Sequence, residues 1–368
     1  MLYLGIDQHA MQLTICIRDK SGNITLRRQV STRPDKVQAF FDDILEQAKA
    51  AGGWVVMLEV CGFNQWLIAL LKKMECDELI LIQPDKKSRR KTDRRDAARL
   101  SELLWVNRER LLAAERVQGV RRVYIPTETE ADSRQVTSWR ERLGKQRTRV
   151  INAIEHLLNK NNLIHHKPTK TFQTVAVRKW LRQLELTSID KLELNQLLDQ
   201  WELLEKQIQQ VHSVVQQRTK EDKNAQLLTT MTGKTGYTAL AIASRVGPIE
   251  RFKSARSFTN YLGLTPTCNS SGNREQLGHI SKEGSPIIRF LLGQQVLHVL
   301  KRDPSLKAWY QRVKKRRGAK IARVAVMRKL ASSIWYMIRY QEPYQPMTKR
   351  ILSNHHNNRY NERQAITS

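Results

Sequence analysis

A run of five apolar residues, Trp54-Val55-Val56-Met57-Leu58, restricts the possible folds of this chain more than any other segment. Gly52-Gly53 precedes the run and Glu59 ends it, so its length fits a β-strand and is short for a helix. A strand that is apolar at every position is typical of the centre of an α/β sheet, where both faces are covered. We therefore expect an α/β domain built around this strand.

The segments around this run predict the rest of the domain. Short apolar runs separated by turn-forming residues predict strands, and apolar residues on one face after Pro34 predict a helix. The predicted order is β-β-β-α-β-α-β, followed by a basic helix. The predicted elements are strands at 2–6, 13–17, 24–30, 54–58 and 79–82, and helices from residue 34 and at about 64–74.

The middle third of the chain has a helical pattern of another kind. Seven apolar residues alternate spacings of three and four, which is the seam of a coiled coil. A looser stretch at 136–157 and a break at 161–168 predict a helical hairpin. A bundle within one chain is one interpretation, but so narrow a stripe must be buried on something, and we favour a coiled coil between chains. The seam residues are Leu194, Leu197, Trp201, Leu204, Ile208, Val211 and Val215.

The last third is predicted to be mainly α-helical with glycine-containing loops, and its final helix lies at about 321–340. A polar tail follows Pro346. These changes in composition predict four parts. They are the α/β domain at 1–125, the helical arm at 126–221, a C-terminal domain at 222–345 and a flexible tail at 346–368.

The charge of the chain predicts a polyanionic partner. It has 64 Lys and Arg against 35 Asp and Glu, a net charge of +29, and nucleic acid is the usual partner of such a protein. A membrane surface is less favoured because the basic residues are spread along the chain. No apolar run is long enough to span a bilayer, and the start lacks the pattern of a signal peptide. The four cysteines form no closely spaced pair, so we expect reduced thiols in a cytoplasmic protein.

Four carboxylates stand where a metal site is expected. Asp7 follows the first apolar run, Glu59 ends the central strand, and Asp93 and Asp96 are spaced to share one helix face. Adjacent strands would bring Asp7 and Glu59 together, and a helix packed on the sheet would add the other pair. Such a cluster makes sense only around divalent cations, and all-oxygen ligands favour Mg²⁺ or Mn²⁺. Two such ions would clamp the attacking and leaving oxygens of a phosphodiester.

Two basic clusters are predicted to bind nucleic acid. The first surrounds the acidic pair and would offset the repulsion between carboxylates and phosphate. The second follows Trp309 and Tyr310, and its alternative interpretation is a solvated helix face. The first comprises Lys86, Lys87, Arg89, Arg90, Lys91, Arg94 and Arg95, and the second Lys314, Lys315, Arg316, Arg317, Lys320 and Arg323.

A segment rich in turn formers lies between residues 263 and 285. It contains Gly263-Leu264-Thr265-Pro266, then Ser270-Ser271-Gly272, then Ile280-Ser281-Lys282-Glu283-Gly284, and Arg289 follows. By composition alone this is an ordinary loop.

Taken together with the YLGID start, the LEVCG strand end and KTDRRDA, these motifs resemble the DEDD transposases of insertion-sequence family 110. That family includes the 1111 subgroup and the pilin-gene invertases. The resemblance covers almost the whole chain, and the motifs follow in the expected order. It implies a RuvC-like (RNase H fold) N-terminal domain, a coiled-coil arm and a C-terminal transposase domain. It also implies a prokaryotic recombinase, associated with the nucleoid and guided by a structured bridge RNA that pairs with target and donor DNA.

The resemblance also implies roles for particular residues. The acidic tetrad of the family falls on Asp7, Glu59, Asp93 and Asp96, and its nucleophilic serine falls on Ser271, with Ser270 as an alternative. Ser271 would form a covalent phosphoserine link to DNA, activated by the metal-bound tetrad. One departure is the segment 232–236, which replaces the family's Pro-Gly-Ile-Gly-Pro and resembles the end of a phosphate-binding loop. No apolar strand leads into it, which argues against ATP binding.

We therefore expect a DNA recombinase of an insertion sequence that uses Mg²⁺, double-stranded target and donor DNA, and a guide RNA. Strand exchange needs several active centres, so we expect dimers that pair into a tetramer through the arms. Two other hypotheses stay open. One is a RuvC-like junction nuclease that hydrolyses DNA with metal-bound water, and the other is a non-catalytic protein that coats nucleic acid.

Overall fold

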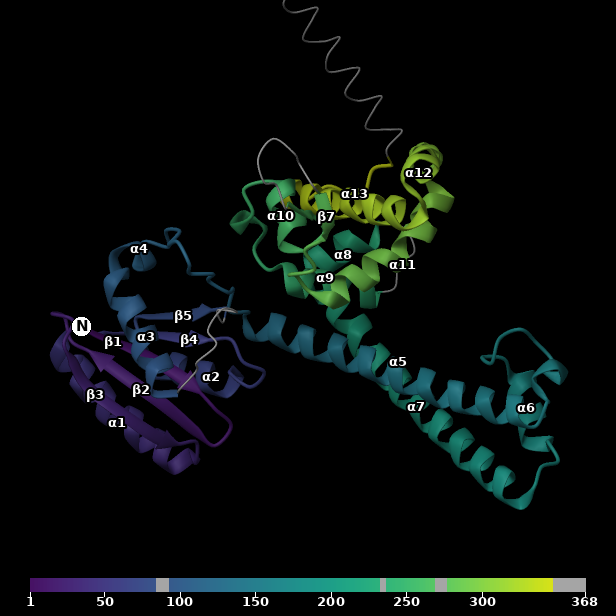
Figure 1. Ribbon diagram of the computed structural model, residues 1–368, viewed down its shortest axis with the longest axis horizontal. Helices are drawn as coiled ribbons and strands as arrows, with labels where there is room; N and C mark the ends of the chain where they lie inside the picture. Colours follow the sequence, from purple (N-terminus) through teal and green to yellow (C-terminus); the bar gives the residue numbers. More distant parts are fainter. Residues whose placement is uncertain (84–92, 232–235, 269–276, 347–368) are drawn as a thin grey trace, which may run out of the picture. The chain divides into compact units, whose positions relative to one another are not determined.

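A computed structural model describes residues 1–83, 93–231, 236–268 and 277–346. The chain divides into two compact units, the first at residues 1–125 and the second from residue 126 onward (Figure 1). The further division into arm, C-terminal domain and tail at 221/222 and 345/346 stays a prediction.

The first unit is a mixed α/β domain around a five-stranded sheet, and its elements follow the predicted order. The strand order is β3-β2-β1-β4-β5, in which β1, β4 and β5 are parallel, β2 runs antiparallel to its neighbours β1 and β3, and β3 therefore has the same direction as β1. The strands are β1 (Leu2–Gln8), β2 (Gln12–Arg18), β3 (Ile24–Ser31), β4 (Trp54–Glu59) and β5 (Glu78–Ile82). The helices are α1 (Pro34–Ala51), α2 (Gln65–Lys73), α3 (Asp93–Val106) and α4 (Arg108–Leu112).

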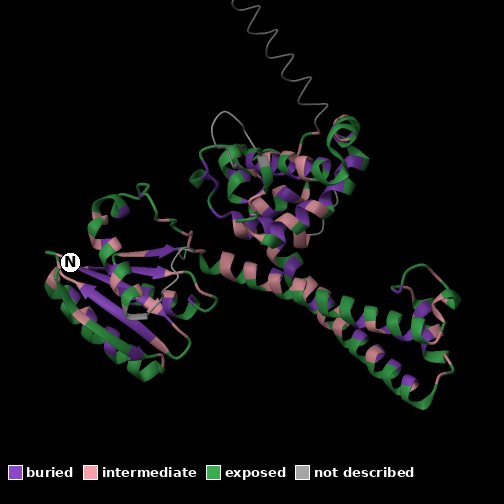
Figure 2. Ribbon diagram, viewed as in Figure 1, coloured by how far each residue is buried: buried purple, intermediate pink, exposed green. Residues whose placement is uncertain are grey.

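Strand β4 is apolar from Trp54 to Leu58 because helices cover both faces of the sheet. Val56 and Leu58 pack in a core with residues of α1 and α2. Val55 and Met57 point to the other face and pack with α3. The alternation of side chains along a strand thus sends neighbouring residues into two separate cores, and Figure 2 shows the central strands buried.

The cysteines of the described residues agree with the expectation of reduced thiols. Cys16, Cys61 and Cys76 are free. Burial, with a smaller effect of Asp77 and Glu78, raises the pKa of Cys76 to about 11, so this thiol is protonated at neutral pH. Among the residues that the structure describes, no helix has the length and apolar character needed to cross a membrane.

The second unit is mainly helical. Its arm contains α5 (Glu128–Lys160), η1 (Ile164–His166), α6 (Val175–Gln183) and α7 (Ser188–Glu221). Beyond the arm lie α8 (Lys223–Thr229), α9 (Gly236–Val246), η2 (Ile249–Arg251), α10 (Ala255–Tyr261), α11 (Pro286–Arg302), α12 (Pro304–Arg317) and α13 (Ala319–Tyr340). Two short antiparallel strands, β6 (Pro266–Cys268) and β7 (Leu277–Ile280), were not predicted from the sequence.

The arm is an antiparallel hairpin of α5 and α7 (Figure 1). Ion pairs join its two helices near both ends: Lys160 with Asp190, 2.7 Å apart, and Arg218 with Asp132, 3.0 Å apart. The predicted seam is buried within this one chain, since Leu194 and Trp201 pack with Ile154 of α5 and Leu181 of α6. The structure therefore favours the bundle within one chain over a seam between chains. Only a turn at 161–168 was predicted from the sequence between the two helices of the hairpin, whereas helix α6 also lies there and covers the end of the stripe.

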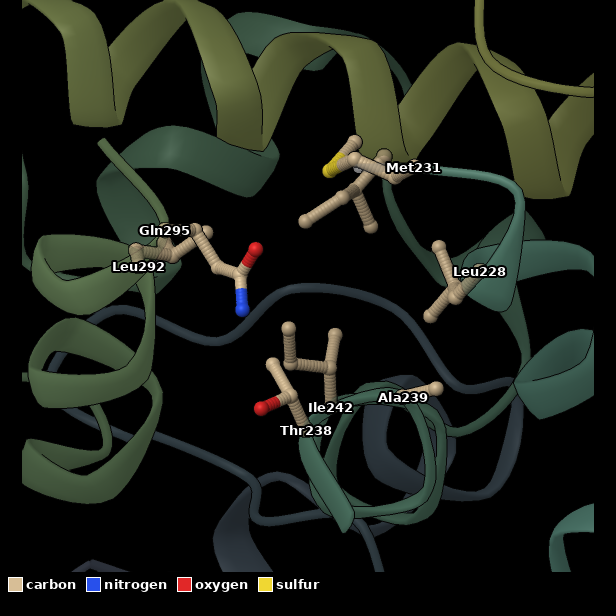
Figure 3. A pocket seen from close by; sticks show the side chains of 8 residues that line it. Leu228, Met231, Thr238, Ala239, Ile242, Leu292 and Gln295 are labelled. Carbon is tan, nitrogen blue, oxygen red and sulfur yellow. The ribbon is translucent and has the colours of Figure 1, made fainter. Parts of the chain in front are cut away.

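The largest core of the second unit joins α8, α9, α11 and α13 with the base of the hairpin. Arg245 of α9 donates from Nη1 to Thr137 Oγ1 and from Nη2 to Ser138 Oγ, both on α5. A cavity of about 20 Å³ lies in this core between Leu228, Ile242 and Gln295 (Figure 3). A cavity of this size holds a single water, so it is a packing defect and cannot accommodate a substrate.

Asp190 joins the two ends of the hairpin tip, and its removal should loosen the arm. Its carboxylate accepts hydrogen bonds from Lys160 Nζ (2.7 Å) and Asn161 Nδ2 (3.0 Å), which lower the pKa of Asp190. We predict that Asp190→Asn lowers the melting temperature, whereas Asp199→Asn, at an exposed position of α7, leaves it nearly unchanged.

The pH dependence of that difference provides a second test. A lowered folded-state pKa contributes stability that is present above the ordinary carboxyl pKa and is lost as the pH falls through the folded value. The gap in melting temperature between wild type and Asp190→Asn should therefore shrink on acidification. A gap that grows towards low pH would contradict this assignment.

Candidate active site

Asp7 and Glu59 lie side by side at one edge of the sheet. Strands β1 and β4 are parallel with Ile6 opposite Leu58, and continuing this register by one residue sets Asp7 opposite Glu59. Gly5 and Met57 face α3, and Asp7 and Glu59 lie two residues after them in the same strands. Because side chains alternate along a strand, Asp7 and Glu59 lie on the same face as α3. Neighbouring strands are about 4.8 Å apart, which brings the two acidic residues together as the sequence predicts.

Helix α3 crosses β1 at unusually close range. A Cβ atom on Gly5 would lie 2.3 Å from both the Ala97 carbonyl oxygen and the Ser101 nitrogen, so only glycine fits there. Arg18 Nε donates to Ser101 Oγ, and Trp105 Nε1 donates to the Lys20 carbonyl. Lys20 lies in the turn that follows β2, next to the start of β1, so α3 runs antiparallel to β1. Its first turn is therefore directed towards the carboxyl end of β1.

Because α3 runs in this direction, its first turn, which contains Asp93 and Asp96, lies towards the Asp7 end of β1. Residue 93 precedes Ala97 by one turn, about 6 Å along the helix, and two residues of strand separate Gly5 from Asp7 by about 6.6 Å. Asp96 is half-buried. The backbone of Asp93 begins α3, but its side chain lies outside the described residues.

Each of the two strand carboxylates has a basic neighbour. Asp7 Oδ2 lies 3.1 Å from His9 Nε2, and Glu59 Oε1 accepts from Arg99 Nη2 at 2.7 Å. The side chains of Asp7 and Glu59 are each 17% exposed, so both are largely buried but still reach solvent. Arg99 was not among the site residues predicted from the sequence. Its spacing of three from Asp96, which puts both on one helix face, was the available signal.

A buried polar network supports the loop that follows Glu59. Asn64 Nδ2 donates to Gln8 Oε1 (2.8 Å) and to the Glu59 carbonyl oxygen (3.2 Å), and Asn64 Oδ1 accepts from the Cys61 amide. Gln8 Nε2 donates to the Phe63 carbonyl at 3.2 Å. The network ties the end of β1 to the end of β4, which fixes the two carboxylates relative to each other. It was not predicted from the sequence.

The donors of this site suit a hard divalent cation. Asp7 and Glu59 offer carboxylate oxygens, the ligand type that Mg²⁺ and Mn²⁺ prefer. Within the described ranges, no group of three or more His, Cys, Asp and Glu side chains is arranged to hold a metal. Asp7, Glu59 and Asp96 are all described, and the structure does not gather these three into one such group. The complete ligand set, which includes Asp93, stays a prediction.

The second predicted constellation is a backbone cradle in the second unit. Gly263 has a φ of +67°, and a Cβ there would lie 2.6 Å from the Glu283 nitrogen. Ser281 N donates to the Thr265 carbonyl and Lys282 N to the Gly263 carbonyl. Arg289 Nη1 donates to the carbonyls of Leu262 (3.2 Å) and Gly284 (2.5 Å). These contacts join the Gly263–Pro266 motif, the Ile280–Gly284 motif and Arg289 into one backbone arrangement.

The predicted nucleophile belongs to the segment that connects β6 and β7. Pro266 pairs with Ile280, and Cys268 with Leu277. Ser271 and its alternative Ser270 are in the intervening segment, which lies outside the described residues.

The basic clusters are described in part. Arg95 is exposed, the side chain of Arg94 is outside the described set, and so are Lys86, Lys87, Arg89, Arg90 and Lys91. In the second unit, Lys314, Lys315, Arg316 and Arg317 form the exposed last turn of α12, where cations also favour the helix dipole. Lys320 and Arg323 are exposed on α13. Nucleic-acid binding by these residues stays a prediction.

Comparison with known proteins identifies the class of this chain. A DEDD transposase model of the IS110 group matches residues 4–162, and a model for the transposase IS116/IS110/IS902 family matches residues 225–311. The chain is thus a transposase, an enzyme that acts on DNA. It belongs to the IS110/IS116 family of DEDD transposases.

Curated relatives agree with this assignment. The transposase for insertion sequence element IS1111A of Coxiella burnetii is 29% identical over 349 residues, which cover 93% of this chain and 90% of the relative. A probable family 20 transposase of Pseudomonas aeruginosa is 28% identical over 233 residues, 61% of this chain and 68% of the relative. The transposase for IS1328 of Yersinia enterocolitica is 28% identical over 146 residues, 39% of this chain and 44% of the relative.

Asn64 provides a test of the network that holds the two strand ends. Asn64→Ala removes the hydrogen-bond partners of the buried Gln8 side chain and of the Cys61 amide. We predict that the free energy of unfolding falls by about 1–3 kcal/mol, measured by denaturant titration of the full chain. Gln47→Ala, at an exposed position of α1, is the control. Equal stability of the two variants would show that the network does not hold this edge.

Proposed function

We propose that this transposase cleaves and exchanges DNA strands by metal-dependent chemistry at Asp7, Glu59, Asp93 and Asp96, through a covalent intermediate on Ser271. The observation that carries the proposal is the pairing of Asp7 and Glu59 on one face of the sheet, at the edge towards which the first turn of α3 is directed. The mixed five-stranded sheet with this strand order also suits a RuvC-like (RNase H) fold.

The four acidic residues would hold the divalent ion, Mg²⁺ or Mn²⁺. When bound, it would neutralise charge on the phosphodiester and favour ionisation of an attacking hydroxyl. Arg99 beside Glu59 offers a counter-charge where phosphate approaches, which supports a site built for a polyanion. The Asn64–Gln8 network would hold Asp7 and Glu59 in place while DNA binds.

The serine step is a transesterification. The Ser271 hydroxyl oxygen would bond to phosphorus while the bond from phosphorus to a deoxyribose oxygen breaks. The serine proton leaves to solvent or a base, and the departing oxygen gains a proton to become a hydroxyl. The cradle of Gly263, Gly284 and Arg289 supports this proposal because it fixes both strands that flank the serine segment.

Guidance and assembly complete the proposal. An element-encoded RNA would select the DNA sites, and the arms would bring copies together as a dimer that pairs into a tetramer near the nucleoid. Leu192, Leu203 and Val214 of α7 are 55%, 56% and 46% exposed. Their spacing of eleven residues puts them on one helix face. This outward stripe supports self-association by a surface other than the buried seam.

The serine proposal is tested by trapping a protein–DNA adduct on a denaturing gel with a cognate DNA. Wild type and Ser270→Ala should form the adduct in the presence of Mg²⁺, and Ser271→Ala should form none because the attacking oxygen is gone. Adduct formation by Ser271→Ala would contradict the assignment. Cleavage without any adduct would instead indicate a hydrolytic junction nuclease, and folded protein without any cleavage would indicate a non-catalytic binding protein.

RNA guidance is tested separately by sequencing the nucleic acid that copurifies with the full chain. We predict one RNA of defined length and sequence. A random collection of fragments would contradict guidance and leave the DNA chemistry of the family unaffected.

A further inference from the structure

A basic pocket of about 420 Å³ lies on the second unit. Residues from three helices line it: Arg256 and Thr259 of α10, Trp309 of α12, and Arg328, Lys329 and Ser332 of α13. Helix α13 packs against both α10 and α12, so these helices form the walls (Figure 1). Neither basic cluster selected from the sequence includes any of these residues.

The pocket carries positive charge that the described protein does not neutralise. Among the described residues, no ion pair with a carboxylate includes Arg256, Arg328 or Lys329. None of the described residues that line the pocket is acidic. Residues 304–341 contain eleven Lys and Arg and no Asp or Glu. Three cations around one hollow repel one another, so the arrangement is stabilised by an anion that enters it.

The pocket also has a preorganised aromatic wall. Lys329 Nζ lies 4.6 Å from the centroid of the Trp309 ring, a cation–π contact that holds the ammonium group at the pocket. Thr259 is buried and its hydroxyl donates to the Arg256 carbonyl, while the Ser332 hydroxyl donates to the Arg328 carbonyl. Both hydroxyl hydrogens are thus used within the helices, so the three cations are the groups of the pocket that would bind a phosphate.

Two exposed aromatic side chains lie next to the pocket, further along α13. Ser332, Tyr336 and Tyr340 follow one another at intervals of four residues, so they lie along one face at steps of about 6 Å. The two tyrosines are 44% and 61% exposed, and their rings stack with centroids 6.2 Å apart and an angle of 14° between planes. Exposed, parallel aromatic rings beside a basic groove are the features with which proteins bind unpaired bases.

We propose that this surface of α10, α12 and α13 binds an unpaired DNA strand. A phosphate of the strand enters the Arg256–Arg328–Lys329 pocket, and the adjacent bases stack on Tyr336 and Tyr340. The bases of a duplex are stacked on each other and cannot use the tyrosine faces, which is why an unpaired strand fits and a duplex does not. DNA is favoured because the family acts on DNA. The inference rests on that activity, in which strand exchange exposes single strands, and adds a site for them.

The test measures equilibrium binding of a fluorescent twelve-nucleotide oligo-dT to the full chain, in EDTA so that no cleavage contributes. We predict that Arg256→Ala/Arg328→Ala weakens binding by about tenfold or more, equivalent to about 1.4 kcal/mol. Lys179→Ala/Lys206→Ala, which removes the same charge from exposed positions of α6 and α7, should weaken it much less. Equal weakening by both double variants would overturn the pocket as a specific site.

The tyrosines separate stacking from charge. Tyr336→Leu/Tyr340→Leu should weaken oligo-dT binding by about fivefold or more, within the range for loss of base stacking, and leave binding of a twelve-base-pair duplex unchanged. Tyr336→Phe/Tyr340→Phe should bind as wild type because the rings are kept. A leucine variant that binds oligo-dT as wild type overturns the proposal, as does one that loses duplex binding equally. Tighter, tyrosine-dependent binding of oligo-U than of oligo-dT would overturn the choice of DNA. These assays use neither metal nor Ser271, so their failure is independent of the catalytic proposal.

Discussion

The contact of helix α3 with Gly5 sets the geometry on which the candidate active site depends. Because Gly5 has no Cβ, the backbone of α3 at Ala97 and Ser101 lies directly on strand β1. Any larger side chain would lift the helix from the sheet. The close contact fixes how far along β1 the first turn of α3 reaches, and it therefore fixes where the acidic residues of that turn lie relative to Asp7 and Glu59. The polar network of Asn64 fixes the two strand carboxylates themselves.

Close backbone contacts and hydrogen bonds from half-buried arginines also hold segments of the second unit together. Arg289 and the close approach of Gly263 to Glu283 fix the strands that flank the serine segment. Arg245 fixes the arm to the helical core. The charge of +29 is distributed over these elements, and the acid-free stretch 304–341 concentrates part of it at the pocket of α10, α12 and α13. The residues proposed for catalysis and those proposed for strand binding are thus different side chains of a single chain.

The sequence predicted what depends on local pattern. Strand β4 was predicted because five consecutive apolar residues indicate a central strand of an α/β sheet. Glu59 and Asp7 were then selected because each is an acidic residue that follows an apolar strand. Contacts between distant segments could not be predicted from local sequence patterns. These contacts are the close approach of α3 to Gly5, the hydrogen bond between Asn64 and Gln8, and the ion pair between Arg99 and Glu59. The heptad seam was recognised, but periodicity cannot say which helix covers it, and the covering helices α5 and α6 belong to the same chain.

The most direct test of the central claim is a titration of the full chain with Mn²⁺, followed by the loss of its free-ion electron paramagnetic resonance signal. We expect saturable binding by wild type and by Asp42→Asn, an exposed position of α1. Asp7→Asn and Glu59→Gln should each bind at least about tenfold more weakly, because outer-shell changes alone cost 10- to 100-fold in affinity. Unchanged affinity in both variants would contradict a metal site at this edge of the sheet.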